Sequence, residues 1–299
     1  MIEPTQRQAA VLEALQNHTV AITELLTQAT KFDGPAPQSW LVDYHHHAVA
    51  RTDLATAAAA GGVPPVWIEH VQARGERGIA YRPEMYLREP DPTDWDRVLG
   101  DLTTDVTRLR EWAGLDVAHR DLAPDSRAAA LRTNIEALRM RTAGVANLLG
   151  LDAEEGELLW GDTTVWAQEV AATLAEVPAE QITHRWHAAA ETDTRNLTGQ
   201  ATALSLAGIA VDTAAALPSS EELYEAISAE LDPVAPLFVS ARGAEAAVGI
   251  DAAVAAALPQ DLDPAVAFSH PAEPEPVSGY DPSDLEAVPL FLSADGAEL

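Results

Sequence analysis

The sequence predicts an all-α protein, in which a multi-helix body with long, coiled-coil-like helices precedes an acidic and largely disordered C-terminal tail. Three observations support this prediction. Only 5% of the residues are aromatic and alanine is abundant, a composition that favours helices over sheets. Apolar residues recur at spacings of three and four, and no window alternates with a period of two. From Asn196 onward, the chain carries 17 acidic residues and one base, Arg242.

The first helix is expected from about Thr5 to Lys31, and the turn residues of Asp33–Pro37 end it. Its apolar positions are separated alternately by four and three residues, which is the heptad spacing of a helix that packs against another helix. The spacing fits a helix hairpin within the chain and a homodimer through the first helix equally well. The positions of this seam are Val11, Leu15, His18, Ile22, Leu25 and Ala29.

A second helix is expected over Ser39–Ala60, and Gly61-Gly62 breaks it. A third begins at Pro64-Pro65, because proline is well tolerated in a first helical turn, and runs to about Arg74. An irregular stretch follows over residues 75–92 and is a candidate sub-boundary within the body.

Further helical segments complete the body, which therefore covers residues 1–217, with the tail over 218–299. Capping residues, apolar faces and glycines mark their ends. The segments are a helix capped by Thr93 or Asp94 with an apolar face from Trp95 to Trp112, a helix after Pro124 that ends at Gly150, short helices over Ala153–Trp160 and Thr163–Val177, and a long segment from Pro178 towards Leu217.

About a quarter of the chain resembles a known group of proteins. The residues that carry this resemblance are Asp94-Trp95-Asp96-Arg97, the run from Arg139 to Leu151, and Leu158-Leu159-Trp160-Gly161. They resemble uncharacterised all-helical proteins of actinobacterial plasmids, phages and integrative elements. The resemblance implies an all-helical fold and no known activity or catalytic residue.

The composition excludes several kinds of function. A net charge of −29 opposes binding to nucleic acid unless the bases are clustered, and it opposes binding to anionic membranes. The absence of cysteine excludes disulfides, thiolate zinc sites and iron–sulfur clusters, and with Lys31 as the single lysine there is no Walker A motif. No cofactor is expected. Neither a secretion signal nor a strongly apolar span is visible, so the expected location is the cytoplasm.

The C-terminal region contains a duplication. The segment PLFVSARGAE, from Pro236 to Glu245, reappears as PLFLSADGAE, from Pro289 to Glu298, with eight of ten positions identical. Upstream, Gly208-Ile209 and the following AAALP run recur in the same register from Gly249, so the units span residues 208–248 and 249–299. Each unit is interpreted as a short Ala-rich helix, an acidic spacer and an apolar patch, although drift in a low-complexity tail produces the same pattern.

The duplication favours a non-enzymatic adaptor or assembly protein that binds a protein partner through its tail. A Leu-Phe pair in a polar, disordered setting is a usual anchor for a groove or a sheet edge, and two copies on one chain raise avidity. The partner is expected to be an oligomer that offers several sites. The candidate binding residues are Pro236, Leu237, Phe238 and Val239 in the first copy and Pro289, Leu290, Phe291 and Leu292 in the second.

Histidine clusters support an alternative, a metal-dependent enzyme. Asp43 with His46 or His47 has helical spacing suited to zinc, and His184 with His187 lies on the same predicted helix face as Glu180 and Glu191. The three successive histidines His45, His46 and His47 cannot converge on one ion from a regular helix, because successive side chains point about 100° apart. A solvent-exposed polar face explains both clusters more simply.

Residues 58–74 support a third alternative, a DNA-binding regulator. Ala58, Gly62, Val63 and Ile68 have the spacing of a helix-turn-helix, whose second helix offers Gln72 and Arg74. Arg77 adds positive charge just beyond it. A simple helix hairpin has the same spacing, and Glu69 lies in the middle of the proposed recognition helix.

Overall fold

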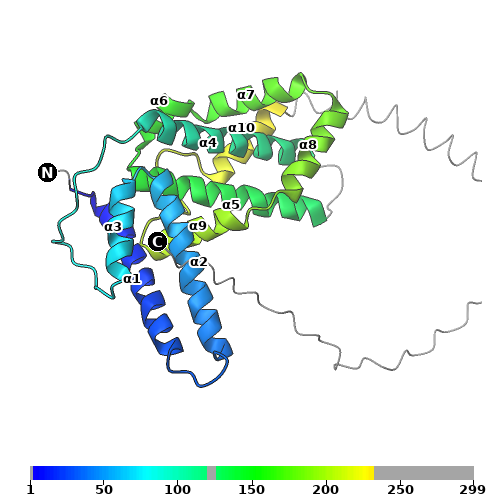
Figure 1. Ribbon diagram of the computed structural model, residues 1–299. Coiled ribbons are helices and arrows are strands. Elements are labelled where there is room, and N and C mark those ends of the chain that lie inside the picture. The colour runs from blue at the N-terminus through cyan, green and yellow to red at the C-terminus, as the bar shows by residue number, and fades with distance from the viewer. Residues whose placement is uncertain (1–2, 120–125, 232–299) are drawn as a thin grey trace, which may run out of the picture. The chain divides into compact units, whose positions relative to one another are not determined.

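The computed structural model describes residues 3–119 and 126–231, and every regular element in these ranges is a helix (Figure 1). This confirms the predicted all-α class. None of the described helices is long and apolar enough to cross a membrane. The predicted tail beyond residue 231 lies outside the described residues. The helices are α1 (Gln6–Ala29), α2 (Gln38–Ala60), α3 (Pro65–Gly75), α4 (Trp95–Ala118), α5 (Ser126–Leu149), α6 (Ala153–Trp160), α7 (Thr163–Ala175), α8 (Ala179–Glu191), α9 (Arg195–Leu206) and α10 (Ser220–Leu231).

Helices α1 and α2 form an antiparallel hairpin, and the loop that joins them extends beyond the rest of the body (Figure 1). Thr5 and Gln8 begin α1 with a capping box, in which each side chain accepts a hydrogen bond from the backbone N–H of the other. Val11, Leu15 and Ile22 are buried, and α1 packs against both α2 and α3. The heptad face of α1 therefore packs against other helices of the same chain.

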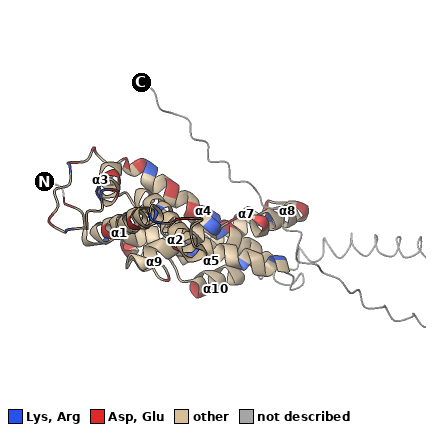
Figure 2. Ribbon diagram, turned by 60° about the horizontal axis from the view of Figure 1, so that its bottom comes forward, with Lys and Arg blue, Asp and Glu red and all other residues tan. Residues whose placement is uncertain are grey.

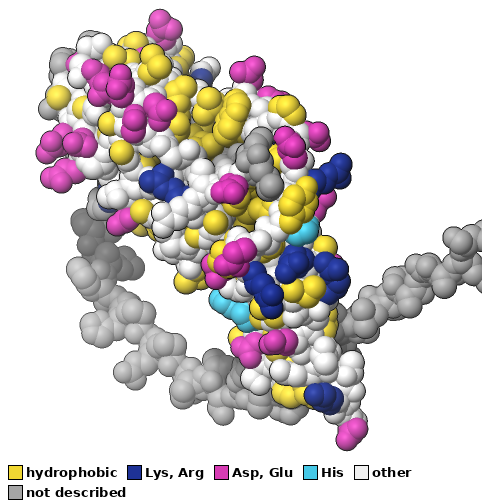
Figure 3. Space-filling model, turned by 90° about the vertical axis from the view of Figure 1, so that its left-hand side faces the viewer, with side chains coloured by type: hydrophobic (Ala, Val, Ile, Leu, Met, Phe, Trp, Pro, Cys, Tyr) yellow, Lys and Arg dark blue, Asp and Glu magenta, His cyan; other side chains and the backbone are white. Residues whose placement is uncertain are grey.

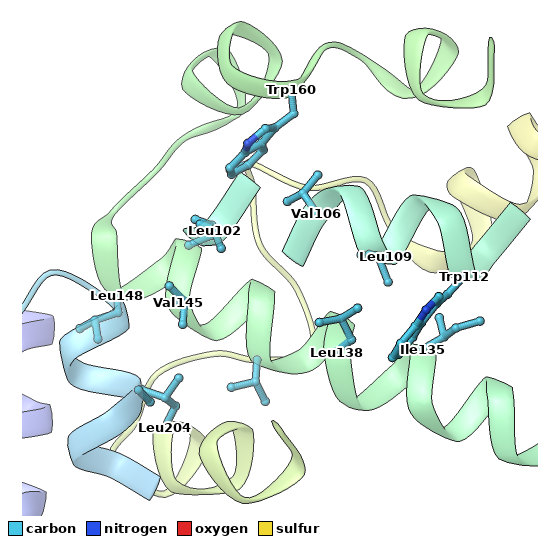
Figure 4. Close-up of a cluster of buried hydrophobic side chains, with 14 of the residues drawn as sticks. Leu102, Val106, Leu109, Trp112, Ile135, Leu138, Val145, Leu148, Trp160 and Leu204 are labelled. Atoms are coloured by element: carbon cyan, nitrogen blue, oxygen red, sulfur yellow. The ribbon is translucent and has the colours of Figure 1, made fainter. Parts of the chain in front are cut away.

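Helices α4 and α5 form the centre of the body, with α7, α8 and α9 packed around them. The Asp94 side chain begins α4 by accepting a hydrogen bond from the backbone N–H of Arg97, and Gly150, at a φ of +85°, ends α5. Figure 4 shows the apolar side chains of the two helices pointing toward one another. Trp95, which the spacing assigned to this face, is 51% exposed, because its ring lies over the Gly62 turn instead.

The prediction of a single long helical segment from Pro178 towards Leu217 is wrong, because the structure has two helices there. The chain leaves the helix at residues 192–194, and α9 starts in a new direction. The buried side chain of Asn134 on α5 stabilises this break, because its amide N–H groups donate to the carbonyl oxygens of Ala189, Ala190 and Thr192. The Thr194 hydroxyl donates to the Asn134 carbonyl oxygen in return. Each of these four hydrogen bonds joins residues more than fifty positions apart, so local sequence patterns do not predict the break.

The predicted end of the body near Leu217 is also wrong, since the structure adds one more packed helix. Residues 207–219 contain no helix, and the chain there passes so close to Gly156 that a Cβ at this position would meet the carbonyl of Ala216. Helix α10 follows and packs on α4 and α7 with Leu223, Ile227 and Leu231 buried. Much of the first duplicated unit therefore belongs to the body, and its predicted acidic spacer includes α10.

The candidate sub-boundary at residues 75–92 lies within one compact unit, and it is a non-helical connection from Glu76 onward. The side chain of Gln16 on α1 donates a hydrogen bond to the carbonyl of Ile79 at 2.6 Å, and the Trp67 indole donates to the carbonyl of Arg88 at 2.8 Å. Tyr81 also packs against the core. These contacts fasten the connection to α1 and α3, so the stretch does not separate two domains.

Several arginines of the body have internal partners, and acidic and basic residues lie side by side along α4 (Figure 2). The guanidinium of Arg110 lies 4.2 Å from the centroid of the Trp166 ring and pairs with Glu169. Arg141 pairs with Asp105, and both side chains are largely buried. The abundance of arginine in the body thus serves packing between helices as well as the surface.

Candidate functional site

The clearest candidate site is an open groove between α2 and α9, which pack against each other. Its volume is about 740 Å³, within the range of ligand-binding clefts. The part of α2 that extends with the hairpin beyond the body forms one wall, and α9 forms the other. The lining residues are Gln38, Leu41, Val42, His45, His46, Val49, Ala50 and Asp53 from α2, and Arg195, Thr198, Gly199, Thr202, Ala203 and Leu206 from α9.

Four large aliphatic side chains of this groove are exposed to solvent. Leu41 is 52% exposed, Val42 60%, Val49 43% and Leu206 66%. A single exposed leucine on a protein surface is ordinary, but several that gather in one groove mark a contact surface for another molecule. The buried side of α2 is formed by other residues, among them Leu54 and Ala57. Helix α2 thus has one apolar face that serves its own fold and a second that the described residues leave uncovered.

Asp53 places a carboxylate in this apolar groove. A Cβ built on Gly199 would lie 2.2 Å from the Asp53 Oδ2, so glycine at this position makes the close approach of α2 and α9 possible. Burial raises the pKa of Asp53 above its ordinary value. Among the described residues, no hydrogen-bond donor or base pairs with Asp53. Arg195, which also lines the groove, pairs with Asp193, a residue whose pKa these hydrogen bonds lower to about 2.

The histidine cluster on α2 is completed by a histidine that the metal hypothesis did not include. His18 of α1 lies with its Nδ1 3.0 Å from the Nδ1 of His47, and its ring centroid is 6.3 Å from that of His46. Burial lowers the pKa of His18, and the nearby His47 and His46 lower it further. Burial and His46 also lower the pKa of His47, against a smaller opposing effect of Asp43.

The predicted metal ligands are not brought together as a set. Within residues 3–119 and 126–231, no group of three or more His, Asp or Glu side chains is arranged to hold a metal ion. His184 is exposed, while His187 lies tilted against the ring of Trp186. Glu191 pairs with Arg127 at 3.8 Å. In the structure, His187 therefore makes an aromatic contact with Trp186, and Glu191 makes a surface ion pair with Arg127.

The proposed recognition helix is α3, and its exposed ridge carries one carboxylate, Glu69, and no base. Trp67, Ile68 and Val71 are buried, and Gln72 and Arg74 are half-buried. Pro65, Glu69 and Ala73 form the exposed ridge, followed by Glu76 and Arg77. Figure 3 looks at the molecule from the side on which α3 lies, and it shows a group of basic side chains with acidic side chains on either side.

His70, Arg74 and Arg77 lie near one another at the end of α3. Burial lowers the pKa of His70, and the charges of Arg74 and Arg77 lower it further. The Nε of Arg74 is buried and has no hydrogen-bond partner within the described residues. Local positive charge is therefore present beyond the exposed ridge of α3, as the DNA-binding hypothesis requires.

Comparisons with known proteins add no assignment. No protein-family model matches the chain, and no curated protein or solved structure is significantly similar to it. The resemblance to proteins of actinobacterial mobile elements stays a prediction.

Sequence reasoning missed the groove, although a signal for it was present. Leu41, His45, Val49 and Asp53 follow one another at intervals of four, which places them in one row along α2. This row is separate from the residues of α2 that pack against the body. A second apolar row on a helix that already has a buried side is the pattern that would have revealed the site.

Proposed function

We propose that this protein is a non-enzymatic adaptor or assembly protein that binds other proteins through short apolar contacts. The observation that carries this proposal is the groove between α2 and α9, in which Leu41, Val42, Val49 and Leu206 expose apolar surface on two packed helices. Fully burying one exposed side chain of this kind contributes about 1.5–3 kcal/mol. The four side chains of the groove are already partly buried and association has its own cost, so binding requires several of them together.

The duplicated PLF[VL]S motifs supply a second recognition element. They lie outside the described residues, and the proposal that they bind a partner rests on their near-identity and their apolar anchors. Pro236 and Pro289 are 53 positions apart, a separation that would span about 40 Å on average with the dimensions of a flexible chain. This distance suits neighbouring subunits of an oligomeric partner, where binding through both motifs would raise avidity.

The experiment that tests the adaptor function is quantitative co-purification of native partners with three forms of the full-length protein. Leu237→Ala with Phe238→Ala, or Leu290→Ala with Phe291→Ala, should leave weak partner binding through the remaining copy. The fourfold variant should lose it. If the fourfold variant retains partners at the wild-type level, the motifs are not the binding elements and the duplication is drift.

Duplex DNA binding through the end of α3 is a second candidate, favoured by the proximity of Arg74 and Arg77 to each other beside His70. The carboxylates of Glu69 and Glu76 on the exposed side of α3 oppose it, because phosphates are repelled by them. Replacing Arg74 and Arg77 with Ala should weaken DNA binding and reduce the slope of log affinity against log salt by about two. Unchanged affinity would remove this candidate.

A further inference from the structure

The two copies of the tail motif differ in charge at one position. The first copy, PLFVSARGAE, has Arg242, and the second, PLFLSADGAE, has Asp295 at the equivalent position. The only other difference is Val239 against Leu292, which preserves apolar character. The two copies therefore present the same apolar anchors with opposite charges, five positions after the leucine.

The groove between α2 and α9 has the complementary arrangement. It offers aliphatic side chains along α2, at Leu41, Val42 and Val49, and ends in the carboxylate of Asp53. No group in the described residues pairs with this carboxylate, and the nearby guanidinium of Arg195 pairs with Asp193. An apolar segment that carries one positive charge would bury the aliphatic side chains and give Asp53 a partner.

We propose that the groove is the docking site of the first copy, with Leu237 and Phe238 on its aliphatic side chains and the guanidinium of Arg242 on the Asp53 carboxylate. The second copy is disfavoured there, because Asp295 would meet Asp53 with the same charge. The inference rests on the proposed function in one respect, namely that the duplicated motif is a protein-binding element.

The spacing of the anchors agrees with this arrangement. Val42 and Asp53 are eleven residues apart on α2, about 17 Å at 1.5 Å per residue. In an extended segment at 3.3 Å per residue, Phe238 and Arg242 point to the same side and lie about 13 Å apart, and the long side chain of Arg242 covers the remaining distance. An extended segment along α2 can therefore place Phe238 near Leu41 and Val42 while Arg242 reaches Asp53, with Leu237 pointing to the opposite side, toward the α9 wall of the groove.

This docking would give the two copies different roles. The first motif would be held by the groove of a second molecule of this chain, because α10 ends at Leu231 on α4 and α7, away from the outer half of α2, and only six residues lead from there to Leu237 (Figure 1). The second motif would remain for the external partner. Binding to an oligomeric partner through both motifs would then require the groove to release the first copy. The groove would thereby control how many motifs the protein presents.

The test uses the full-length protein with Leu237→Asp and Phe238→Asp, which leaves the groove without its own motif. Two labelled synthetic peptides, Pro236–Glu245 and Pro289–Glu298, are titrated against it and binding is followed by fluorescence anisotropy. The first peptide should bind at least about tenfold more tightly than the second, equivalent to about 1.4 kcal/mol. Equal affinities, or no binding of either peptide, would overturn the proposal.

Two further variants locate the site. Asp53→Asn, which keeps the size of the side chain, should abolish the difference between the peptides by weakening binding of the first and relieving the repulsion of the second. Val49→Asp should weaken both, whereas Leu158→Asp should weaken neither, since Leu158 is an 86% exposed leucine on α6 that does not line the groove. An unchanged peptide preference in Asp53→Asn would refute the assigned charge pair.

The same measurements separate this inference from the adaptor function. If the peptides do not bind the groove but the fourfold motif variant loses its native partners, the adaptor function stands and the docking site is wrong. If the peptides bind the groove with the expected preference and the fourfold variant keeps its partners, the docking stands and the motifs serve the chain itself.

Discussion

Helices α5 and α2 have almost the same length, 24 and 23 residues, but very different surroundings. Helix α5 buries eleven of its residues, including Asn134 and Thr142, and contacts α4, α8 and α9. Helix α2 buries four, all in its second half, where it meets the body. Packing therefore explains nearly every apolar residue of α5, whereas Leu41, Val42 and Val49 of α2 have no structural explanation within the described residues. Apolar residues that the fold does not need are the best indication of where this protein binds.

The largest expected effect tests this contrast with the same substitution in both helices. Leu138→Ala in α5 should lower the free energy of unfolding by about 3 kcal/mol, because the fully buried side chain leaves a cavity. Leu41→Ala in α2, where the leucine is 52% exposed, should change it by less than about 0.5 kcal/mol. Urea denaturation followed by circular dichroism measures both. A similar loss in the two variants would mean that the outer part of α2 is packed in solution.

The next effect concerns the polar centre of α5. Asn134→Ala should lower the free energy of unfolding by about 2–3 kcal/mol, because it removes the donor to three carbonyl groups at the break between α8 and α9, two of them in buried hydrogen bonds. Asn17→Ala on the exposed side of α1 is the matched control and should have almost no effect. The denaturant midpoints of the two variants, compared with that of the wild type, test this prediction. If both lie at the wild-type value, Asn134 does not stabilise the break.

Polar substitutions in the groove should affect binding much more than stability. Val42→Asp and Leu206→Asp remove apolar surface that is already 60% and 66% exposed, so the melting temperature should fall by no more than about 2 °C. Affinity for the first tail peptide should fall at least about tenfold. Differential scanning calorimetry and the anisotropy titration make this comparison. A melting temperature that falls in step with affinity would indicate misfolding instead of a lost contact.

The smallest expected effect is the pH dependence that arises from His18 on the hairpin. The pKa of His18 in the folded protein is lowered by burial and by the neighbouring His47 and His46. Between that lowered pKa and the ordinary value of 6.5, the unfolded chain binds more protons than the folded one. Stability contributed by the neutral ring is therefore present above pH 6.5 and declines as the pH falls through this window, until His18 is protonated in both states.

Denaturation of the wild type and of His18→Gln between pH 7.5 and pH 5 measures this contribution. The variant should lose less stability over the interval, because it lacks the group that titrates. His184→Gln, at an exposed position on α8, should behave like the wild type. If His18→Gln and the wild type lose stability in parallel, protonation of His18 is not coupled to folding.

Local sequence signals determined the helical class and most helix ends, because caps and turns act over a few residues. Thr5 with Gln8, Asp94 with the N–H of Arg97, and Gly150 with its positive φ are all recognisable without knowledge of the rest of the fold. The face of α1 that packs was likewise evident from its heptad spacing, although its partners were not.

Tertiary structure decided where helices break against local preference and which distant residues meet. The interruption between α8 and α9 depends on Asn134 of α5, and the inclusion of α10 in the body depends on the surfaces of α4 and α7. His18 contacts His47 because α1 packs against α2, and Asp53 contacts Gly199 because α2 packs against α9. Such contacts join residues from 29 to more than 100 positions apart, so their free energy is determined by the folded arrangement of whole helices, and no short segment of sequence contains it.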